Sequence, residues 1–351
     1  MATPLPPKEF IERARGSFII DVRSPSEYER GHIHGARNIP LFEDDERALV
    51  GTLYKKRGRD AAVETGLGLA GPKLTAYLEQ LRALSPGREV FVHCWRGGMR
   101  SESMAWLFEK AGFEVNLLEG GYKAWRRFIR EDLGKERKYL VLGGLTGSGK
   151  TRWLTQLALM GEQVIDLEKL ACHKGSVFGS IGMKQQPGNE QFENDLFDVV
   201  RSFDEKRVIW LEDESRQIGR ITLPDTFYQV KTSSPLLFIS VPDRLRIRFL
   251  LEDYADCERN QLLDPVQHLA KRLGSERTKQ ISVAIAEGLL EEAARLLLDY
   301  YDTLYRFGLS SRKEGQVHLL NLLDVEEDFF AEKLIIAKNE ILGTKNKNPM
   351  Q

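Results

Sequence analysis

The chain has 351 residues, of which 42% are hydrophobic, so it is long enough for two ordinary globular domains and too apolar to be disordered throughout. Its 51 Lys and Arg residues nearly balance 52 Asp and Glu residues, and the formal net charge of −1 excludes a protein that binds nucleic acid through its overall charge. Three cysteines without CxxC or Cys/His spacing argue against a disulfide framework or a structural zinc site. No apolar run reaches the roughly 20 residues that cross a bilayer, and no signal-peptide pattern is present, so we expect a soluble, cytoplasmic protein without a membrane partner.

Short apolar segments alternate with helical ones in the first third of the chain. Strands are predicted at residues 17–22 (SFIIDV) and 89–94 (EVFVHC), and helices at residues 71–84 and 101–112. This alternation predicts an α/β domain with a parallel sheet. A charged stretch without apolar periodicity, DLGKERK at residues 132–138, follows. We therefore predict one domain at residues 1–133 and a second at 138–351.

The second part begins with a strand, a glycine loop and a helix. Further strands are predicted at residues 163–167, 207–214 and 235–241. From about residue 242 to 307 the apolar residues recur at helical spacing. The second domain is therefore also α/β, with a helical C-terminal part.

The glycine loop, GGLTGSGKT at residues 143–151, has the phosphate-binding pattern between a predicted strand and a predicted helix. Glycines let successive backbone N–H groups turn toward phosphate oxygens, while a lysine adds charge and a threonine hydroxyl can bind Mg²⁺. The predicted phosphate-binding residues are Gly144, Gly147, Ser148, Gly149, Lys150 and Thr151.

Polar residues also follow two later strands of the second domain. Asp213, at the end of RVIWLEDES, is the candidate second ligand of Mg²⁺ beside Thr151. The carboxyl ends of parallel strands gather ligands in α/β sheets. The candidate anion or substrate contacts there are Asp166, His173, Lys174, Ser176 and Arg216.

A cysteine occupies a second glycine-rich loop, FVHCWRGGMRSES at residues 91–103. Cys94 ends a predicted strand, and the amides of Gly97 and Gly98 together with Arg96 and Arg100 can stabilise a thiolate. We predict that Cys94 is catalytic and that the four other residues form an anion-binding loop. Trp95 is a candidate platform for stacking a base, with core packing as an equal alternative.

The segments at residues 19–40 (IIDVRSPSEYERGHIHGARNIP), 92–101 (VHCWRGGMRS) and 118–127 (LEGGYKAWRR) resemble the start, active loop and end of a rhodanese-like domain. The matching cysteine in that family carries transferred sulfur as a persulfide. Common sulfurtransferases have four residues between cysteine and arginine, whereas five separate Cys94 from Arg100 here. Two chemistries therefore stay open: attack on phosphate, as in a cysteine-based phosphatase fused to a kinase-like domain, or transfer from a phosphate-bearing chalcogen donor.

The combination of this loop with GLTGSGKT, DLEKLACHKGSVFG, LEDESRQIG and the insertion at residues 51–74 resembles the tRNA 2-selenouridine synthase family over essentially the whole chain. The resemblance implies a transferase that converts wobble 2-thiouridine in tRNA to 2-selenouridine. In the first step the sulfur receives a geranyl group from geranyl diphosphate, which is held by the phosphate loop. In the second step selenium from selenophosphate replaces the geranylated sulfur at the Cys94 loop.

The resemblance implies three further features. The partners are a tRNA carrying wobble 2-thiouridine and an enzyme that supplies selenophosphate. Basic clusters at residues 55–59, 126–130 and 244–248 are candidate contacts for the tRNA backbone. The segment LLLDYYDTLYRF at residues 296–307 could line a pocket for the geranyl chain, although packing in the domain core is the favoured interpretation.

Overall fold

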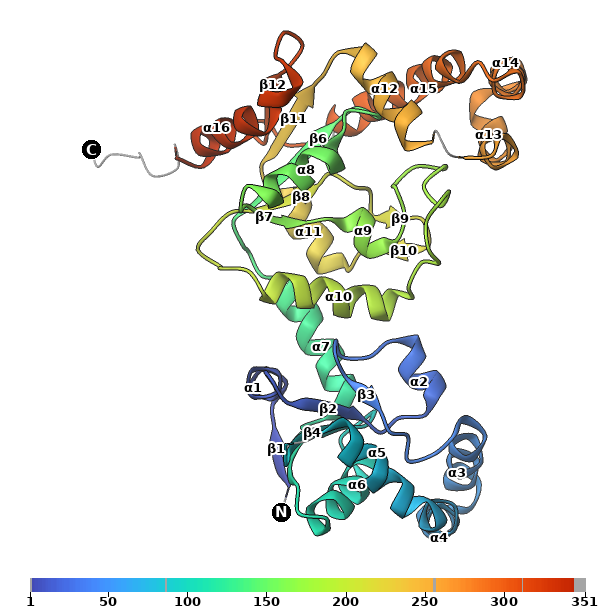
Figure 1. Ribbon diagram of the computed structural model, residues 1–351, viewed down its shortest axis with the longest axis vertical. Helices are drawn as coiled ribbons and strands as arrows, with labels where there is room; N and C mark the ends of the chain where they lie inside the picture. Colours follow the sequence, from blue (N-terminus) through green and yellow to red (C-terminus); the bar gives the residue numbers. More distant parts are fainter. Residues whose placement is uncertain (1, 86, 255–256, 311, 344–351) are drawn as a thin grey trace. The chain divides into compact units, whose positions relative to one another are not determined.

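The fold comes from a computed structural model that describes residues 2–85, 87–254, 257–310 and 312–343 (Figure 1). The chain divides into two compact units. The first comprises Met1–Leu133 and Gly188–Asp198, and the second comprises Gly134–Pro187 and Val199–Gln351. Both units are α/β, which confirms the predicted fold class. Within the described residues, no helix is both long and apolar enough to cross a membrane.

A five-stranded parallel sheet with strand order β1-β5-β4-β2-β3 forms the centre of the first unit. The strands are β1 (Thr3–Leu5), β2 (Phe18–Asp21), β3 (Arg37–Asn38), β4 (Glu89–His93) and β5 (Glu114–Leu118). The central strands β2 and β4 are buried on both faces, as expected of apolar strands in a parallel sheet.

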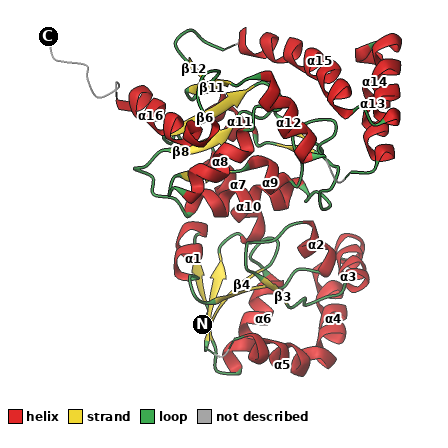
Figure 2. Ribbon diagram, turned by 45° about the horizontal axis from the view of Figure 1, so that its top comes forward, coloured by secondary structure: helices red, strands yellow, loops and turns green. Residues whose placement is uncertain are grey.

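Helices cover both faces of this sheet (Figure 2). They are α1 (Pro7–Arg13), α2 (Pro25–Arg30), α3 (Asp44–Arg57), α4 (Arg59–Ala70), α5 (Leu74–Leu84), α6 (Met99–Lys110) and α7 (Gly121–Leu133). Val90 and Val92 of β4 belong to one apolar cluster with residues of α4, α5 and α6. Phe91, which points to the opposite face, meets Phe10 of α1 in an edge-to-face contact with ring centroids 5.3 Å apart.

Part of helix α10 (Asn189–Arg201) also belongs to the first unit, although it follows the phosphate loop in the chain. Trp125 of α7 donates a hydrogen bond from Nε1 to Oδ1 of Asn194 (2.9 Å). Buried Arg126 pairs with buried Glu193 through Nη2 and Oε2 (2.5 Å). The sequence-based boundary at residues 133–138 did not anticipate this return of the chain.

The second unit has a five-stranded parallel sheet with strand order β12-β11-β6-β8-β7 (Figure 1). Its strands are β6 (Tyr139–Gly144), β7 (Gln163–Ile165), β8 (Ile209–Glu212), β11 (Leu236–Ser240) and β12 (Val317–Asn321). The short strands β9 (Gln217–Ile218) and β10 (Ile221–Thr222) form a separate antiparallel pair. Strands β6 and β8 lie side by side, so the loops that follow them meet at one edge.

The helices of the second unit are α8 (Lys150–Leu159), α9 (Leu167–Ala171), α11 (Asp225–Ser233), α12 (Asp243–Asp253), α13 (Arg259–Leu273), α14 (Ser275–Glu287), α15 (Leu290–Ser310) and α16 (Phe330–Gly343). Trp153 of α8, Phe249 of α12 and Phe330 of α16 pack with the central strands in one apolar cluster. A second cluster joins α13, α14 and α15 with Phe178 from the loop after α9. The predicted helical C-terminal part is thus present and has its own core.

Candidate functional site

The Cys94 thiol lies at the beginning of helix α6. Cys94 follows β4 and is 3% exposed, and its Sγ is 3.2 Å from Oγ of Ser101 and 3.9 Å from the carbonyl oxygen of Gly98. Gly98 is the N-cap of α6. The thiol is therefore enclosed at the first turn of α6, with the Ser101 hydroxyl as its nearest polar neighbour.

Glycines hold the Cys94 loop against the turn before α7. Gly97 has φ +67°, and a Cβ there would lie 2.9 Å from the amide nitrogen of Gly120. A Cβ on Gly121 would lie 2.5 Å from the carbonyl oxygen of Cys94. The amide of Tyr122 donates to that same oxygen (2.8 Å). The loop therefore has a fixed backbone, which only glycine permits at these contacts.

The two arginines of the loop differ in their surroundings. Nη1 of Arg100 donates to Oε2 of Glu27 (2.6 Å), and Arg47 lies 3.5 Å from the same carboxylate. Burial alone would raise the pKa of Glu27, but the bonds to Arg100 bring that pKa below its ordinary value. Arg96 is exposed. Half-buried Trp95 packs with its ring centroid 5.9 Å from that of Tyr122.

A buried polar network supports β4 where it enters the loop. Arg23 pairs with Asp21 through Nη2 and Oδ2 (2.6 Å), and its guanidinium carbon lies 3.8 Å from the ring centroid of Tyr122. His93, the residue before the cysteine, is fully buried with Nε2 3.7 Å from Oδ2 of Asp21. Desolvation lowers the pKa of His93 to about 4, although the Asp21 charge opposes that shift.

The second loop, at residues 143–151, has the curled form that phosphate binding requires. Gly147 and Gly149 have φ +77° and +74°, and Gly149 is the N-cap of α8. A Cβ on Gly144 would lie 2.5 Å from Oγ of Ser148. Nζ of Lys150 donates across the loop to the carbonyl oxygen of Gly144 (3.3 Å). Amides at a helix start, beside a lysine, form a ready anion site.

Thr151 follows Lys150 in the chain, and carboxylates surround its hydroxyl. Oγ1 lies within hydrogen-bond distance of Oε2 of Glu168 (2.9 Å) and of Oε1 of Glu212 (2.7 Å), and its single proton can be donated to only one of them at a time. Burial, together with the charge of Glu214, raises the pKa of Glu168 to about 7. Burial and then the charge of Glu168 raise the pKa of Glu212 well above its ordinary value. These carboxyls are therefore poised to be protonated or to neutralise a bound cation.

Asp213, predicted to join Thr151 at a magnesium ion, is engaged elsewhere. Its Oδ1 accepts from Nζ of Lys231 (3.3 Å) and from Nη2 of Arg312 (2.5 Å). Neighbouring Glu212 is the carboxylate that lies beside Thr151. Among the described residues, no group of three or more His, Cys, Asp or Glu is arranged to hold a metal ion.

Two predicted contacts have local structural roles. Asp166 caps α9, accepting from the amide of Lys169 (2.8 Å) through Oδ1. His173 is buried between two glycines, since a Cβ on Gly179 or on Gly219 would lie 2.6 Å from its ring. Desolvation lowers the pKa of His173. A neutral, enclosed imidazole is a packing element here.

The other three predicted contacts, Lys174, Arg216 and Ser176, lie in different surroundings. Nζ of Lys174 donates to the carbonyl oxygen of Asp253 (3.1 Å). Arg216 pairs with Asp225 on the surface. Ser176, whose Oγ accepts from the amide of Phe178 (3.2 Å), lines a cavity.

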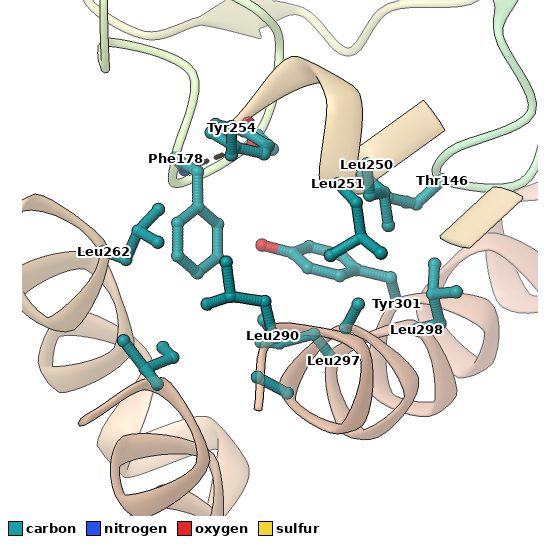
Figure 3. A pocket seen from close by; sticks show the side chains of 14 residues that line it. Thr146, Phe178, Leu250, Leu251, Tyr254, Leu262, Leu290, Leu297, Leu298 and Tyr301 are labelled. Carbon is teal, nitrogen blue, oxygen red and sulfur yellow. Dashed lines mark hydrogen bonds between the residues drawn. The ribbon is translucent and has the colours of Figure 1, made fainter. Parts of the chain in front are cut away.

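That cavity lies between the phosphate loop and the C-terminal helices (Figure 3). It has a volume of about 80 Å³, and Thr146 of the phosphate loop forms part of its wall. Tyr301 reaches into it between Phe178 and Leu251 (Figure 3). Most of the remaining wall is aliphatic, from Leu250, Leu262, Ile285, Leu290, Ala293, Ala294, Leu297 and Leu298. Part of the segment at residues 296–307 thus lines a cavity; its residues 304–307 lie outside the described side chains.

Arg246 joins the cavity to the phosphate loop. It is buried, and Nε donates to the carbonyl oxygen of Thr146 (3.0 Å) while Nη2 pairs with Oδ1 of Asp302 (2.5 Å). The sequence had grouped Arg246 with basic residues that contact tRNA. Its burial, and that of Arg126, excludes both side chains from such a surface, whereas residues 55–59 are exposed.

Comparisons with known proteins identify both parts of the chain. A family model described as the tRNA 2-selenouridine synthase AAA domain matches residues 137–328, and one described as the rhodanese-like domain matches residues 7–128. A tRNA 2-selenouridine synthase of Cupriavidus pinatubonensis is 33% identical over 332 residues, covering 83% of this chain and 88% of the relative. The corresponding protein of Marinobacter nauticus is 34% identical, covering 85% and 90%. That of Aeromonas salmonicida is 33% identical, covering 90% and 93%. Because one model spans more than half of the chain and these relatives match most of it, the chain belongs to the tRNA 2-selenouridine synthase family of enzymes.

Proposed function

We propose that this transferase converts 2-thiouridine at the wobble position of tRNA into 2-selenouridine in two steps, through an S-geranylated intermediate. The family's name supports the product. The observation that supports the intermediate is the apolar cavity whose wall includes Thr146 of the phosphate loop. A cavity of this kind beside an anion site suits a ligand with a phosphorylated head and a hydrocarbon tail.

The first step is alkylation at the phosphate loop. The sulfur of 2-thiouridine attacks C1 of geranyl diphosphate, the C1–O bond breaks, and diphosphate leaves with the electron pair while the N3 proton passes to solvent. The amides of the loop and Lys150 stabilise the charge that develops on the leaving oxygen. The leucines of the cavity exclude water from the allylic carbon.

A magnesium ion fits the acidic end of the loop. Thr151, Glu168 and Glu212 offer oxygen ligands, which Mg²⁺ prefers, and burial together with the charges of nearby carboxylates raises the pKa values of both glutamates. Such an ion would offset the charge of the diphosphate.

The second step belongs to the Cys94 loop. Selenium of selenophosphate attacks C2 of the uracil ring, the C2–S bond breaks, and geranylthiolate leaves with the electron pair and takes a proton. Water then hydrolyses the Se–P bond, releasing inorganic phosphate and 2-selenouridine. Alkylation makes this displacement possible, because a thiol departs more readily than a thiocarbonyl sulfur. Cys94 and Arg96 would contact the donor, and the amides around Gly97 and Gly98 would bind its phosphate.

The partners follow from this chemistry. The anticodon loop of a tRNA presents unpaired bases that can enter a site without melting a duplex. The exposed basic residues at 55–59 can bind its backbone. Selenophosphate is reactive, so we also propose an enzyme that supplies it.

Nucleoside mass spectrometry tests the proposal. Pure protein is incubated with 2-thiouridine-containing tRNA, geranyl diphosphate and selenophosphate, each small molecule being omitted in turn. We expect a geranylated nucleoside without selenophosphate and its conversion to a selenium-containing nucleoside on addition. A direct change from 2-thiouridine to 2-selenouridine without geranyl diphosphate would rule out the intermediate, and an unchanged nucleoside would rule out the enzyme activity.

A further inference from the structure

An apolar trough lies in the first unit, between the hairpin of α3 and α4 and the first half of α6. It has a volume of about 630 Å³. Apolar residues from all three helices line it, among them Val50, Tyr54, Val63, Leu67, Met99 and Trp106. Leu67 is 69% exposed and Trp106 is 57% exposed. Side chains of this size in one concave surface indicate a binding site.

Small residues keep the trough open. Gly51 of α3 and Gly66 of α4 line it, as do two alanines of α4. A Cβ on Gly51 would meet no atom within 4 Å, so no packing constraint requires glycine there. Glycine destabilises a helix relative to alanine. The missing side chain at position 51 therefore leaves space in the trough that a ligand can occupy.

The trough shares Arg100 with the Cys94 loop. Met99 and Arg100 line the trough and are the first two residues of α6, directly after the N-cap Gly98. The next residue, Ser101, contacts the Cys94 thiol at 3.2 Å. Arg100 is held by Glu27 at 2.6 Å. A ligand here would have a polar end at the cysteine loop and an apolar part along α6.

We propose that this trough holds the geranyl chain of the S-geranylated tRNA nucleoside while selenium replaces its sulfur. The inference rests on the proposed two-step function. In the second step the C2–S bond breaks and the electron pair leaves with geranylthiolate, which takes a proton. The ten-carbon chain stays attached to that sulfur until the bond breaks, so an apolar seat is needed where selenium arrives. The cavity beside the phosphate loop serves the geranyl group of the diphosphate, and the trough serves the geranyl group of the tRNA.

The trough also explains the insertion at residues 51–74, which common sulfurtransferases lack. That insertion contains the second half of α3 and all of α4, and therefore one wall of the trough. A sulfurtransferase with an inorganic leaving group has no use for such a wall. The added helices thus determine which leaving group the rhodanese-like unit accepts.

The test compares Gly51→Leu with Gly68→Leu. A leucine at position 51 projects into the trough, whereas Gly68 is an exposed residue of α4 that does not line the trough and whose Cβ would also meet no atom within 4 Å. Purified S-geranylated tRNA and a matched S-methylated tRNA, whose leaving group is too small for the trough, are converted with selenophosphate by the full chain. We expect Gly51→Leu to lower kcat/KM for the geranylated tRNA about tenfold, to leave the S-methylated tRNA unaffected, and to keep geranyl transfer intact. Gly68→Leu should match the wild type throughout.

Each other outcome has a distinct meaning. If the wild type does not convert S-geranylated tRNA, the proposed function fails at its second step. If the wild type converts it and Gly51→Leu does so equally well, the trough assignment is overturned while the function stands. Equal slowing of both tRNAs would also overturn it, since the trough would then bind tRNA or another protein. Should Gly51→Leu fold poorly, Leu67→Glu on the trough wall replaces it, with Leu159→Glu on exposed α8 as control.

Discussion

Arg246 donates a hydrogen bond from Nε to the carbonyl oxygen of Thr146 at 3.0 Å, which ties helix α12 to the phosphate loop. The same guanidinium pairs with Asp302 of α15. Two walls of the apolar cavity are therefore fixed to the residue at which the cavity meets the loop. Binding of the diphosphate and of its hydrocarbon chain should depend together on this one side chain.

Replacing Arg246 with methionine should impair folding stability and geranyl transfer at once. The substitution leaves Asp302 without its main partner, and breaking a largely buried pair costs about 3 kcal/mol or more in the free energy of unfolding. Urea denaturation measures this loss, and a geranyl transfer assay on the folded fraction measures the catalytic one. Arg248→Met, two residues along α12 and half exposed, should cost less than about 1 kcal/mol. Equal effects of the two variants would contradict the proposed role of Arg246.

Lys150→Ala should abolish geranyl transfer while sparing selenation. Removing one group that stabilises a developing negative charge slows a reaction by about 100-fold or more. Tritiated geranyl diphosphate measures transfer to tRNA. Chemically geranylated tRNA should still become selenated in the presence of selenophosphate. Loss of both activities in a folded variant would mean that the two sites do not act separately.

Cys94→Ser should show the reverse pattern. In the proposed second step the sulfur of Cys94 contacts selenophosphate, and a serine oxygen is smaller and less polarisable than that sulfur, so S-geranylated tRNA should accumulate and selenium incorporation should be lost. Nucleoside mass spectrometry quantifies both products. Cys172→Ser in the second unit is the matched control and should retain both steps. Undiminished selenation by Cys94→Ser would remove the thiol from the mechanism.

Filling the apolar cavity should change which diphosphate the enzyme accepts. Ala294 lines the cavity, and a phenylalanine there would occupy space needed by the far end of a geranyl chain. Losing about two buried CH₂ groups, at about 0.8 kcal/mol each, raises KM roughly tenfold. Dimethylallyl diphosphate, with half the carbon atoms, should be affected less. Ala286→Phe, at an exposed position of α14 outside the cavity, should leave both KM values unchanged. A uniform rise for both diphosphates would count against a chain-length role.

The stability of the first unit should fall in acid because of His93. Its folded pKa, about 4, lies below its ordinary value of 6.5, so the folded state binds fewer protons than the unfolded state. Its stabilising contribution is complete above pH 6.5 and is lost as the pH falls through about 4. His93→Gln should therefore give a shallower decline in the free energy of unfolding between those values. Denaturant titrations at several pH values measure the slope, and parallel slopes would contradict the prediction.

The sequence predicted both loops because the residue pattern of each is local in the chain, although the Cys94 loop also rests on Gly120 and Gly121. Glycines that permit positive φ, and a lysine or cysteine at fixed spacing from them, carry a local signal. Asp166 was found for a similar reason, as an acid after a strand, yet its role proved to be that of a helix cap.

Long-range pairings were not readable in the sequence. Glu27 pairs with Arg100, which lies 73 positions away in the chain, and Asp302 pairs with Arg246, which lies 56 positions away. An arginine in a basic run has the same local pattern whether it is exposed or buried. Glu212 and Asp213 likewise differ by one position, and the direction of the strand determines which of them faces Thr151. Side chains alternate between the two faces of a strand, so the sequence would have identified Glu212 if it had shown which face of β8 lies toward Thr151.

Residues Gly188–Asp198 belong to the first unit, so a single cut in the chain cannot separate the two units. A fragment that ends at Leu133 would lack Glu193 and Asn194, leaving the buried guanidinium of Arg126 and the indole N–H of Trp125 without their acceptors. Such a fragment should be less stable than the same residues within the whole chain, even though it contains every strand of its sheet. Biochemists who want the cysteine loop alone would need to graft the α10 segment onto it, and a genetic screen that separates the two activities should use point substitutions in preference to truncation.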